Sequence, residues 1–440
     1  MRTTTMPLGY TFEVGGKEPH RNRLSTLLIL FYLALLVIQP QNRFPYLGEI
    51  QFEKIVVGAI VATLIFGKGI ALKAGRMTFL VLAFYAILLV SYLVSPYNQF
   101  QLSQEWLGNY WKYILLYFLI ILSTKELRSL RLLFIGFAGI IAFYQAYSWW
   151  DFLHGGSYVW QQGIRRMVGM WTEGIGAANY FGMLTVYSLP FLLFWYQASE
   201  EKVTKAFVLG CFFMTTMSVV YSGTRGALLT FLFFVAFNLI RMKKYLAICV
   251  SLAVLFLSVQ ILPSYLVQRY STVIPSLAIE NRESDSTVDE MQRGSALSRL
   301  NGITDALSLV AIRPLIGHGP NSSPLARMQV NEMFADSEEV FQMHSLYGQV
   351  LAESGILGTA IFFLIVLTCL AGLGRVPRRS SDDRCVALYQ EALVNFLLIL
   401  LCYGFASHTL YRYYWPLAWG LCAAFLHIMK QQKLTKSAEH

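Results

Sequence analysis

The chain has 440 residues, of which 56% are hydrophobic and only 14% are charged. This composition is too apolar for a soluble domain of that length and indicates a polytopic membrane protein. The formal net charge of +10 is explained by basic cytoplasmic loops, so it does not require a nucleic-acid partner.

Apolar runs long enough to cross a hydrocarbon core of about 30 Å predict twelve transmembrane helices. The predicted spans are 24–39, 50–66, 77–95, 106–122, 132–149, 179–196, 206–221, 225–240, 245–261, 348–373, 386–406 and 413–429. The second, fourth and eleventh reach full length only by including a polar or aromatic end. We therefore expect an all-α membrane protein of about twelve transmembrane helices with one large periplasmic loop that contains amphipathic helices.

The distribution of basic residues predicts the orientation, because cytoplasmic loops are enriched in Lys and Arg. Placing both termini in the cytoplasm puts 22 of the 35 Lys and Arg residues in short cytoplasmic segments. The chain then divides into an N-terminal membrane region (1–261), a periplasmic loop region (262–343), and a C-terminal membrane region with a cytoplasmic tail (344–440).

The 13 basic residues on the outer side differ in kind from the inner ones. Eleven are Arg, and the two lysines, Lys54 and Lys112, lie at span ends. Arg offers a planar fork of donors that fits phosphate oxygens two at a time, whereas Lys is a point charge. This bias towards Arg is suited to binding a phosphorylated ligand. Alternatively, the arginines simply neutralise the acidic residues of the same loop, which explains the bias equally well.

Two outer connections carry notable arginines. The connection from Trp149 to Asn179 contains the pair Arg165 and Arg166, and the short connection Ser222–Gly226 places Arg225 at the head of the eighth span. The helix dipole disfavours Arg at an N-terminus. An anion bound there, held by the guanidinium and the first-turn N–H groups, would make the position reasonable. Snorkelling of the side chain to the interface is the alternative.

The large loop has a predicted structure of its own. Apolar positions recur at helical spacing from Ser295 to Ile312 and predict an amphipathic helix at the outer interface. Pro314 ends it, and Gly317 and Gly319 form a turn. Helix is expected to resume near Ser337 and to continue through His344 into the tenth span. In a continuous helix, Glu353 would lie on the face opposite His344, so the two are not expected to pair.

Three fragments of the chain together resemble one family of bacterial membrane enzymes. They are SGTRGALL at 222–229, RPLIGHGPN at 313–321 and MHSLYGQVLAESGILG at 343–358. Their order and spacing are similar to those of the O-antigen ligase and O-antigen polymerase superfamily. The resemblance covers residues 165–358 directly. It implies a C-type glycosyltransferase-like fold in the bacterial inner membrane, with the active site facing the periplasm.

The resemblance also implies a reaction and a set of site residues. O-antigen polysaccharide would move from undecaprenyl diphosphate to lipid A-core oligosaccharide; a repeat-unit polymerase, a protein O-glycosylation ligase and, more distantly, a polysaccharide-lipid transporter are the alternatives. Ser345, where Asn is common, leaves the acceptor open. The residues that match the family's motifs are Arg225, Arg299, His344 and one of Arg165 and Arg166, and Arg313 and Tyr347 complete the expected diphosphate-binding or glycan-binding set.

The chemistry of such a transfer is consistent with these residues. A sugar attached to diphosphate already has a good leaving group, so the protein must bind the negative charge and remove a proton from the acceptor hydroxyl. His344 is expected to be the general base, with inversion at the anomeric carbon and no cofactor; helix capping is its alternative role. Asp336 and Glu338 have the spacing of a divalent-cation site, but helix capping explains them too.

Overall fold

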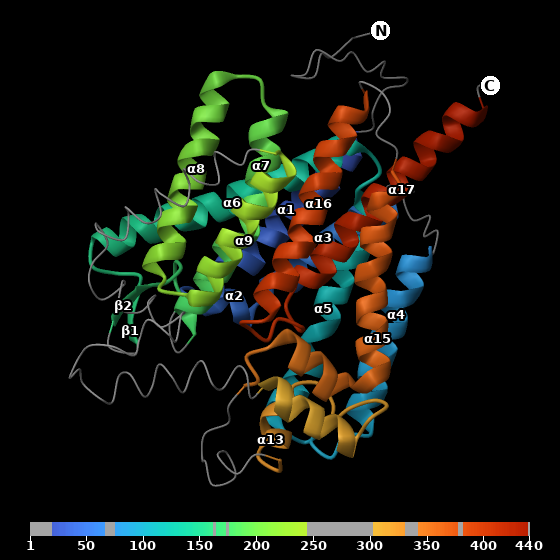
Figure 1. The fold of residues 1–440 in the computed structure, drawn as a ribbon. Coiled ribbons are helices and arrows are strands. Elements are labelled where there is room, and N and C mark those ends of the chain that lie inside the picture. The colour runs from blue at the N-terminus through green and yellow to red at the C-terminus, as the bar shows by residue number, and fades with distance from the viewer. Residues whose placement is uncertain are drawn as a thin grey trace. The chain divides into compact units, whose positions relative to one another are not determined.

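The computed structural model describes residues 20–66, 75–161, 164–172, 176–243, 302–330, 342–376 and 382–438. These residues are mostly helical (Figure 1). The N-terminal half contains α1 (His20–Ile38), η1 (Pro40–Asn42), α2 (Tyr46–Glu49), α3 (Phe52–Phe66), α4 (Arg76–Leu93), α5 (Gln101–Ser123), α6 (Leu127–Leu153), β1 (Tyr158–Gln161), β2 (Ile164–Met167), α7 (Ala177–Ala198), α8 (Lys202–Tyr221) and α9 (Arg225–Arg241). The later elements are a helix at Gly302–Ile312, α13 (Ser323–Arg327), α15 (Leu346–Gly374), α16 (Asp382–Gly404) and α17 (Tyr414–Ala438).

Every predicted span except 245–261 coincides with one of these helices, and 245–261 lies outside the described residues. Within the described part of the chain, six helices are long and apolar enough to cross a membrane: α4, α6, α7, α8, α15 and the Cys385–Gly404 part of α16. The chain therefore has the helical, multi-pass character expected from its composition.

The start of α5 differs from the prediction. Helix α5 begins at Gln101, five residues before the predicted span 106–122. Polar residues such as Gln101 and Gln104 form a helix readily but do not belong to a hydrocarbon-spanning run, so hydropathy misses the first turns. Lys112 accordingly lies in the middle of the helix rather than at its end.

The structure contains two compact units, each built from segments that are distant in the sequence. The first consists of the described residues within 1–33, 52–134 and 298–440. In it, α5 packs against α17, and α4 packs against α15. Aromatic rings fill the core: Trp419 meets Phe84 edge-on at 6.1 Å between centroids, and Trp415 meets Phe362 at 4.8 Å.

The second unit consists of the described residues within 34–51 and 135–297. Helix α7 packs against both α8 and α9 (Figure 1). Its position explains its burial, since 83% of its most apolar window lies inside the structure, against 33% for α8.

A β-hairpin of this second unit was not predicted. Strands β1 and β2 are antiparallel, with Val159 opposite Arg166 and Trp160 opposite Arg165. The sequence contained only a partial signal for it: Tyr158, Val159 and Trp160 favour a strand before Gly163, but the run after it, Ile164–Met167, has a single β-branched residue and no aromatic one. A search for long apolar spans passes over strands of four residues.

Candidate functional site

Arg166 connects the hairpin to the turn that precedes α9. Its side chain is buried, with 1% of its surface exposed. The guanidinium donates Nε to the Ser222 carbonyl at 2.8 Å and Nη2 to the Thr224 hydroxyl at 3.1 Å. It also donates to the side-chain oxygens of Gln161 at 2.5 Å and Asn179 at 2.7 Å. These bonds fix the plane of the guanidinium against the Ser222–Thr224 turn.

Arg165 lies in different surroundings, although it is the adjacent residue. Its guanidinium carbon is 4.1 Å from the ring centroid of Tyr158 and 4.6 Å from that of Phe152. It donates a long hydrogen bond of 3.3 Å to the Phe152 carbonyl. Neighbouring residues of a strand point to opposite faces, so only Arg166 reaches the turn before α9. The structure thus separates two arginines that the sequence left equivalent.

Arg225 is the first residue of α9, as predicted. Gly223 has a left-handed φ of 59° and Thr224 is extended, so the chain turns sharply before the helix. Arg225 itself is buried, with 6% exposed. The Thr224 hydroxyl does not cap the helix, because it accepts from Arg166 and donates to the Ala178 carbonyl at 3.0 Å. The turn therefore accepts hydrogen bonds from the buried Arg166 and leads directly into the buried Arg225.

In the first unit, the motif RPLIGHGPN is joined to α15 by backbone hydrogen bonds. Helix α15 breaks at Gly355, whose φ is 64° and ψ is −166°. The turn satisfies the groups that the break leaves unpaired. His318 N and Gly319 N donate to the carbonyls of Ala352 and Glu353 at 2.9 and 3.1 Å, and Ile356 N and Leu357 N donate to those of Pro314 and Leu315 at 2.8 and 3.1 Å.

Glycine is required on both sides of this contact. A Cβ on Gly317, whose φ is 73°, would lie 2.6 Å from the backbone nitrogen of Gly355. A Cβ on Gly355 would lie 2.5 Å from the Leu315 carbonyl oxygen. Two of the three recognised sequence motifs are therefore a single structural element in this unit.

Glu353 stabilises the same element from inside. Its side chain is fully buried, and its carboxylate accepts hydrogen bonds from Asn321 N at 3.0 Å, Ser323 N at 3.3 Å and the Ser323 hydroxyl at 2.5 Å. The Tyr411 hydroxyl lies nearby, and its own burial, followed by the Glu353 charge, raises the pKa of Tyr411 well above its usual value. Glu353 thus binds the turn, a role that spacing along a single helix could not indicate.

His344 does not lie in a helix, and the prediction of continuous helix through it is wrong. Residues 342–345 are non-helical, His344 has a left-handed φ of 50°, and α15 begins only at Leu346. Ser345 is extended and caps the helix by accepting from Gly348 N at 3.3 Å. A left-handed residue that is not glycine carries strain, which persists where the surroundings hold it in place.

A second histidine, which sequence reasoning missed, lies against His344. The ring of His408, between α16 and α17, is 5.4 Å from the ring of His344 between centroids. Its Nδ1 is buried and has no hydrogen-bond partner among the residues that the structure describes. Burial, followed by the charges of His344 and Arg412, lowers the pKa of His408 to about 3. His408 is therefore a neutral neighbour of His344 near neutral pH.

The helix at Gly302–Ile312 is held close to the His344 segment. A Cβ on Gly302 would lie 2.4 Å from the Met343 carbonyl oxygen, so the two backbones are in direct contact. The buried Arg327 forms an ion pair at 2.7 Å with Asp305, a residue of this helix, and donates a hydrogen bond to the Gln342 carbonyl at 3.1 Å. The ion pair thus links the helix, α13 and the segment that enters His344.

The remaining predicted site residues are placed as follows. Arg313 is half-buried and donates to the Val94 carbonyl at 2.8 Å. Tyr347 donates its hydroxyl to the Leu401 carbonyl at 2.8 Å and packs on Phe405. These contacts give both side chains a structural role. Arg299, Asp336 and Glu338 lie outside the described residues.

One comparison with known families identifies the segment that contains these motifs. Residues 209–363 match the family model described as O-antigen ligase. The match identifies an O-antigen ligase domain. The superfamily predicted from the three sequence motifs is therefore confirmed. None of the curated proteins matches the chain.

The O-antigen ligase domain contains Arg225, the interlocked turn and break, and His344. Arg165, Arg166 and the second histidine, His408, lie outside it. Two residues outside the domain therefore contact residues inside it. Arg166, which precedes the domain, bonds to the turn before α9, and His408, which follows it, packs against His344. Within the described residues, no group of three or more His, Cys, Asp and Glu side chains is placed to hold a metal ion.

Proposed function

We propose that this protein transfers O-antigen polysaccharide from undecaprenyl diphosphate to lipid A-core oligosaccharide on the periplasmic face of the bacterial inner membrane. The observation that carries the proposal is the O-antigen ligase match, which spans both Arg225 and His344. These are the two residue types that the transfer needs, a cation for the departing diphosphate and a base for the acceptor hydroxyl.

In the proposed reaction, an acceptor hydroxyl attacks the sugar C1 and forms the new glycosidic bond. The bond between C1 and the diphosphate oxygen breaks, and the electron pair leaves with undecaprenyl diphosphate. His344 takes the proton of the attacking hydroxyl. A single displacement inverts the configuration at C1. The chain needs no metal in this scheme, because arginines supply the positive charge.

Each arginine has a distinct part in the proposal. Arg225 and Arg299 bind the diphosphate, and Arg166 holds the turn that presents Arg225. Support for the part of Arg299 comes from the sequence, in which it lies three positions before Gly302. Gly302 in turn contacts Met343, the neighbour of His344.

His408 is proposed to position the base. Its neutral imidazole packs on His344, and restricts the orientations that the His344 ring can take at a backbone conformation that is already strained. His408 is therefore a positioning residue, which acts through His344 and touches no substrate in this scheme.

Purified protein in detergent tests the proposal directly. It is incubated with undecaprenyl diphosphate-linked glycan alone, with lipid A-core alone, and with both, and the products are separated by gel electrophoresis. Product only from the complete mixture supports the ligase. Chain elongation from the donor alone would instead identify a polymerase, and glycan transferred only to an added acceptor protein would identify a protein O-glycosylation ligase.

The proposed topology has twelve spans, cytoplasmic termini and a periplasmic region 262–343 between membrane regions 1–261 and 344–440. Its support is the bias of basic residues towards the other side. A single cysteine at Ser286 should react with a membrane-impermeant thiol reagent in cells with a permeabilised outer membrane. Labelling only after lysis of the inner membrane would show that this region lies in the cytoplasm, opposite to the proposed orientation.

A further inference from the structure

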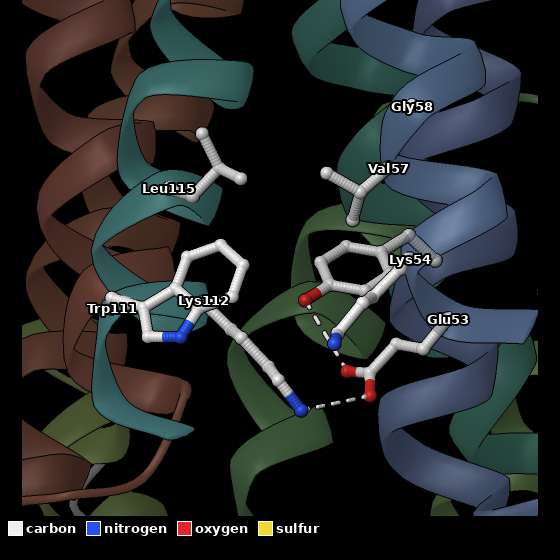
Figure 2. Close-up of a pocket in the computed structure, with 8 residues that line it drawn as sticks. Glu53, Lys54, Val57, Gly58, Trp111, Lys112 and Leu115 are labelled. Carbon is white, nitrogen blue, oxygen red and sulfur yellow. Dashed lines mark hydrogen bonds and ion pairs between the residues drawn. The ribbon is translucent and has the colours of Figure 1, made fainter. Parts of the chain in front are cut away.

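A pocket in the first unit lies between α1, α3 and α5 (Figure 2). Its volume is about 200 Å³. It is lined by Tyr32, Glu53, Lys54, Val57, Gly58, Trp111, Lys112 and Leu115. A pocket of this size accommodates a lipid headgroup but not an oligosaccharide.

One end of the pocket is charged. The Glu53 carboxylate accepts a hydrogen bond from the Tyr32 hydroxyl at 3.4 Å and forms an ion pair with the Lys112 ammonium at 3.5 Å. Lys54 follows Glu53 in the first turn of α3, and Figure 2 shows its ammonium at the same end. In the part of the chain that the structure describes, Lys54 has no ion-pair partner. This end of the pocket therefore holds two ammonium groups and one carboxylate, and only the Lys112 ammonium is paired with that carboxylate.

The other end is apolar and open. Val57, Gly58 and Leu115 lie there, on α3 and α5 (Figure 2). A Cβ on Gly58 would meet nothing within 4 Å, so the glycine leaves space beside the helix. The surrounding surface is also apolar, with Ile55 57% exposed and Trp111 41% exposed. Exposed apolar side chains on helices of a membrane protein face acyl chains, and Trp is typical of the headgroup level.

We propose that this pocket binds a phospholipid whose headgroup carries a phosphate and a primary amine, as in phosphatidylethanolamine. The phosphate lies between Lys54 and Lys112, the ammonium of the lipid pairs with Glu53, and an acyl chain runs along Gly58. The inference is independent of the proposed transfer reaction. It concerns the lipid that surrounds the protein rather than a substrate.

Charge complementarity selects this headgroup over two others. An anionic headgroup such as phosphatidylglycerol satisfies the lysines but brings no cation to Glu53, which would repel it. A choline headgroup carries the right charges, but its quaternary nitrogen cannot donate a hydrogen bond to the carboxylate. Only a primary amine meets both requirements in a pocket that already holds groups of both signs.

Native mass spectrometry of the full-length protein tests the proposal with three lipids that have identical acyl chains: phosphatidylethanolamine, phosphatidylglycerol and phosphatidylcholine. The wild-type protein should bind phosphatidylethanolamine most tightly. Glu53→Gln removes the partner of the amine and raises the net charge of the pocket, so it should reverse the preference in favour of phosphatidylglycerol. The affinity ratio of the two lipids should change by about tenfold or more, the effect of one charge-assisted hydrogen bond.

Two further variants and a control keep the test decisive. Lys54→Gln, at an exposed residue outside the Glu53 ion pair, should weaken binding of both phosphatidylethanolamine and phosphatidylglycerol. Gly58→Leu should weaken binding of all three lipids, because its Cβ lies in open space and the rest of the side chain takes up room that the acyl chain would occupy. Lys202→Gln, at an exposed lysine that begins α8, should change nothing. Equal affinity for the three lipids in the wild-type protein, or an unchanged ratio in Glu53→Gln, would overturn the proposal.

Discussion

Arg166 and Arg165 offer a matched pair of substitutions, because two adjacent arginines differ only in what they contact. Arg166→Lys retains the charge but removes the fork that reaches Ser222, Thr224, Asn179 and Gln161. Arg165→Lys removes one long hydrogen bond to Phe152 and leaves a cation between two aromatic rings. Any difference between the two variants therefore measures the contacts of the guanidinium and not the charge.

The magnitude follows from the contacts. A lysine ammonium has three donors at a single point and cannot span acceptors that belong to the hairpin, α7 and the turn before α9. At least two of the hydrogen bonds that Arg166 donates to these acceptors must be lost, each worth about 1.5 kcal/mol or more because the donor is charged. We expect Arg166→Lys to lower the free energy of unfolding by about 3 kcal/mol. Arg165→Lys should cost less than about 1 kcal/mol, since cation–π contacts survive.

Two measurements check this prediction. Thermal unfolding in detergent should give a lower Tm for Arg166→Lys and a nearly unchanged Tm for Arg165→Lys. Glycan transfer, assayed at a temperature where both variants are folded, should fall more in Arg166→Lys because the turn that presents Arg225 is no longer held. Equal Tm values and equal transfer rates in the two variants would refute the assignment of Arg166 to this turn.

Three other predictions concern the first unit. Gly355→Ala should lower the free energy of unfolding by about 3 kcal/mol or more, because the backbone conformation is open almost only to glycine and the new Cβ meets the Leu315 carbonyl; Gly139→Ala in α6, where the Cβ meets nothing within 4 Å, is the control in thermal unfolding and should be neutral or slightly stabilising. His344→Ala should reduce turnover by about 10²–10⁴-fold with donor binding retained, and excess EDTA should not change the wild-type rate. Transfer at the wild-type rate in His344→Ala would contradict the proposed chemistry. So would inhibition by EDTA that Mg²⁺ reverses. In the folded chain the pKa of His408 is lowered to about 3, so between pH 7 and 5 only the unfolded chain protonates this residue, and the free energy of unfolding should fall on acidification. His408→Asn should show a smaller decrease in Tm over that range. An identical decrease would show that His408 is not responsible.

Several features of this protein were predictable because they depend on local sequence. Hydrophobicity over a window of residues reports directly on transmembrane helices, since every backbone polar group in a span must be satisfied within the helix. The start of α9 at Arg225 and the left-handed turn at Gly317 and Gly319 likewise follow from short-range preferences of the chain. The family was recognisable from three short motifs for the same reason.

The tertiary structure decided the rest, because the deciding contacts join residues that are distant in the sequence. Helical spacing predicted that His344 continues into α15, but Ser345 caps that helix and the turn at 314–321 inserts at its break. The same packing gave Glu353 its partners near Asn321, and brought His408 against His344 across more than sixty residues of chain. The sequence alone does not distinguish Arg165 from Arg166, because they are adjacent residues of the same type. Only the pairing of two strands, which turns adjacent side chains to opposite faces, selects Arg166 for the turn before α9.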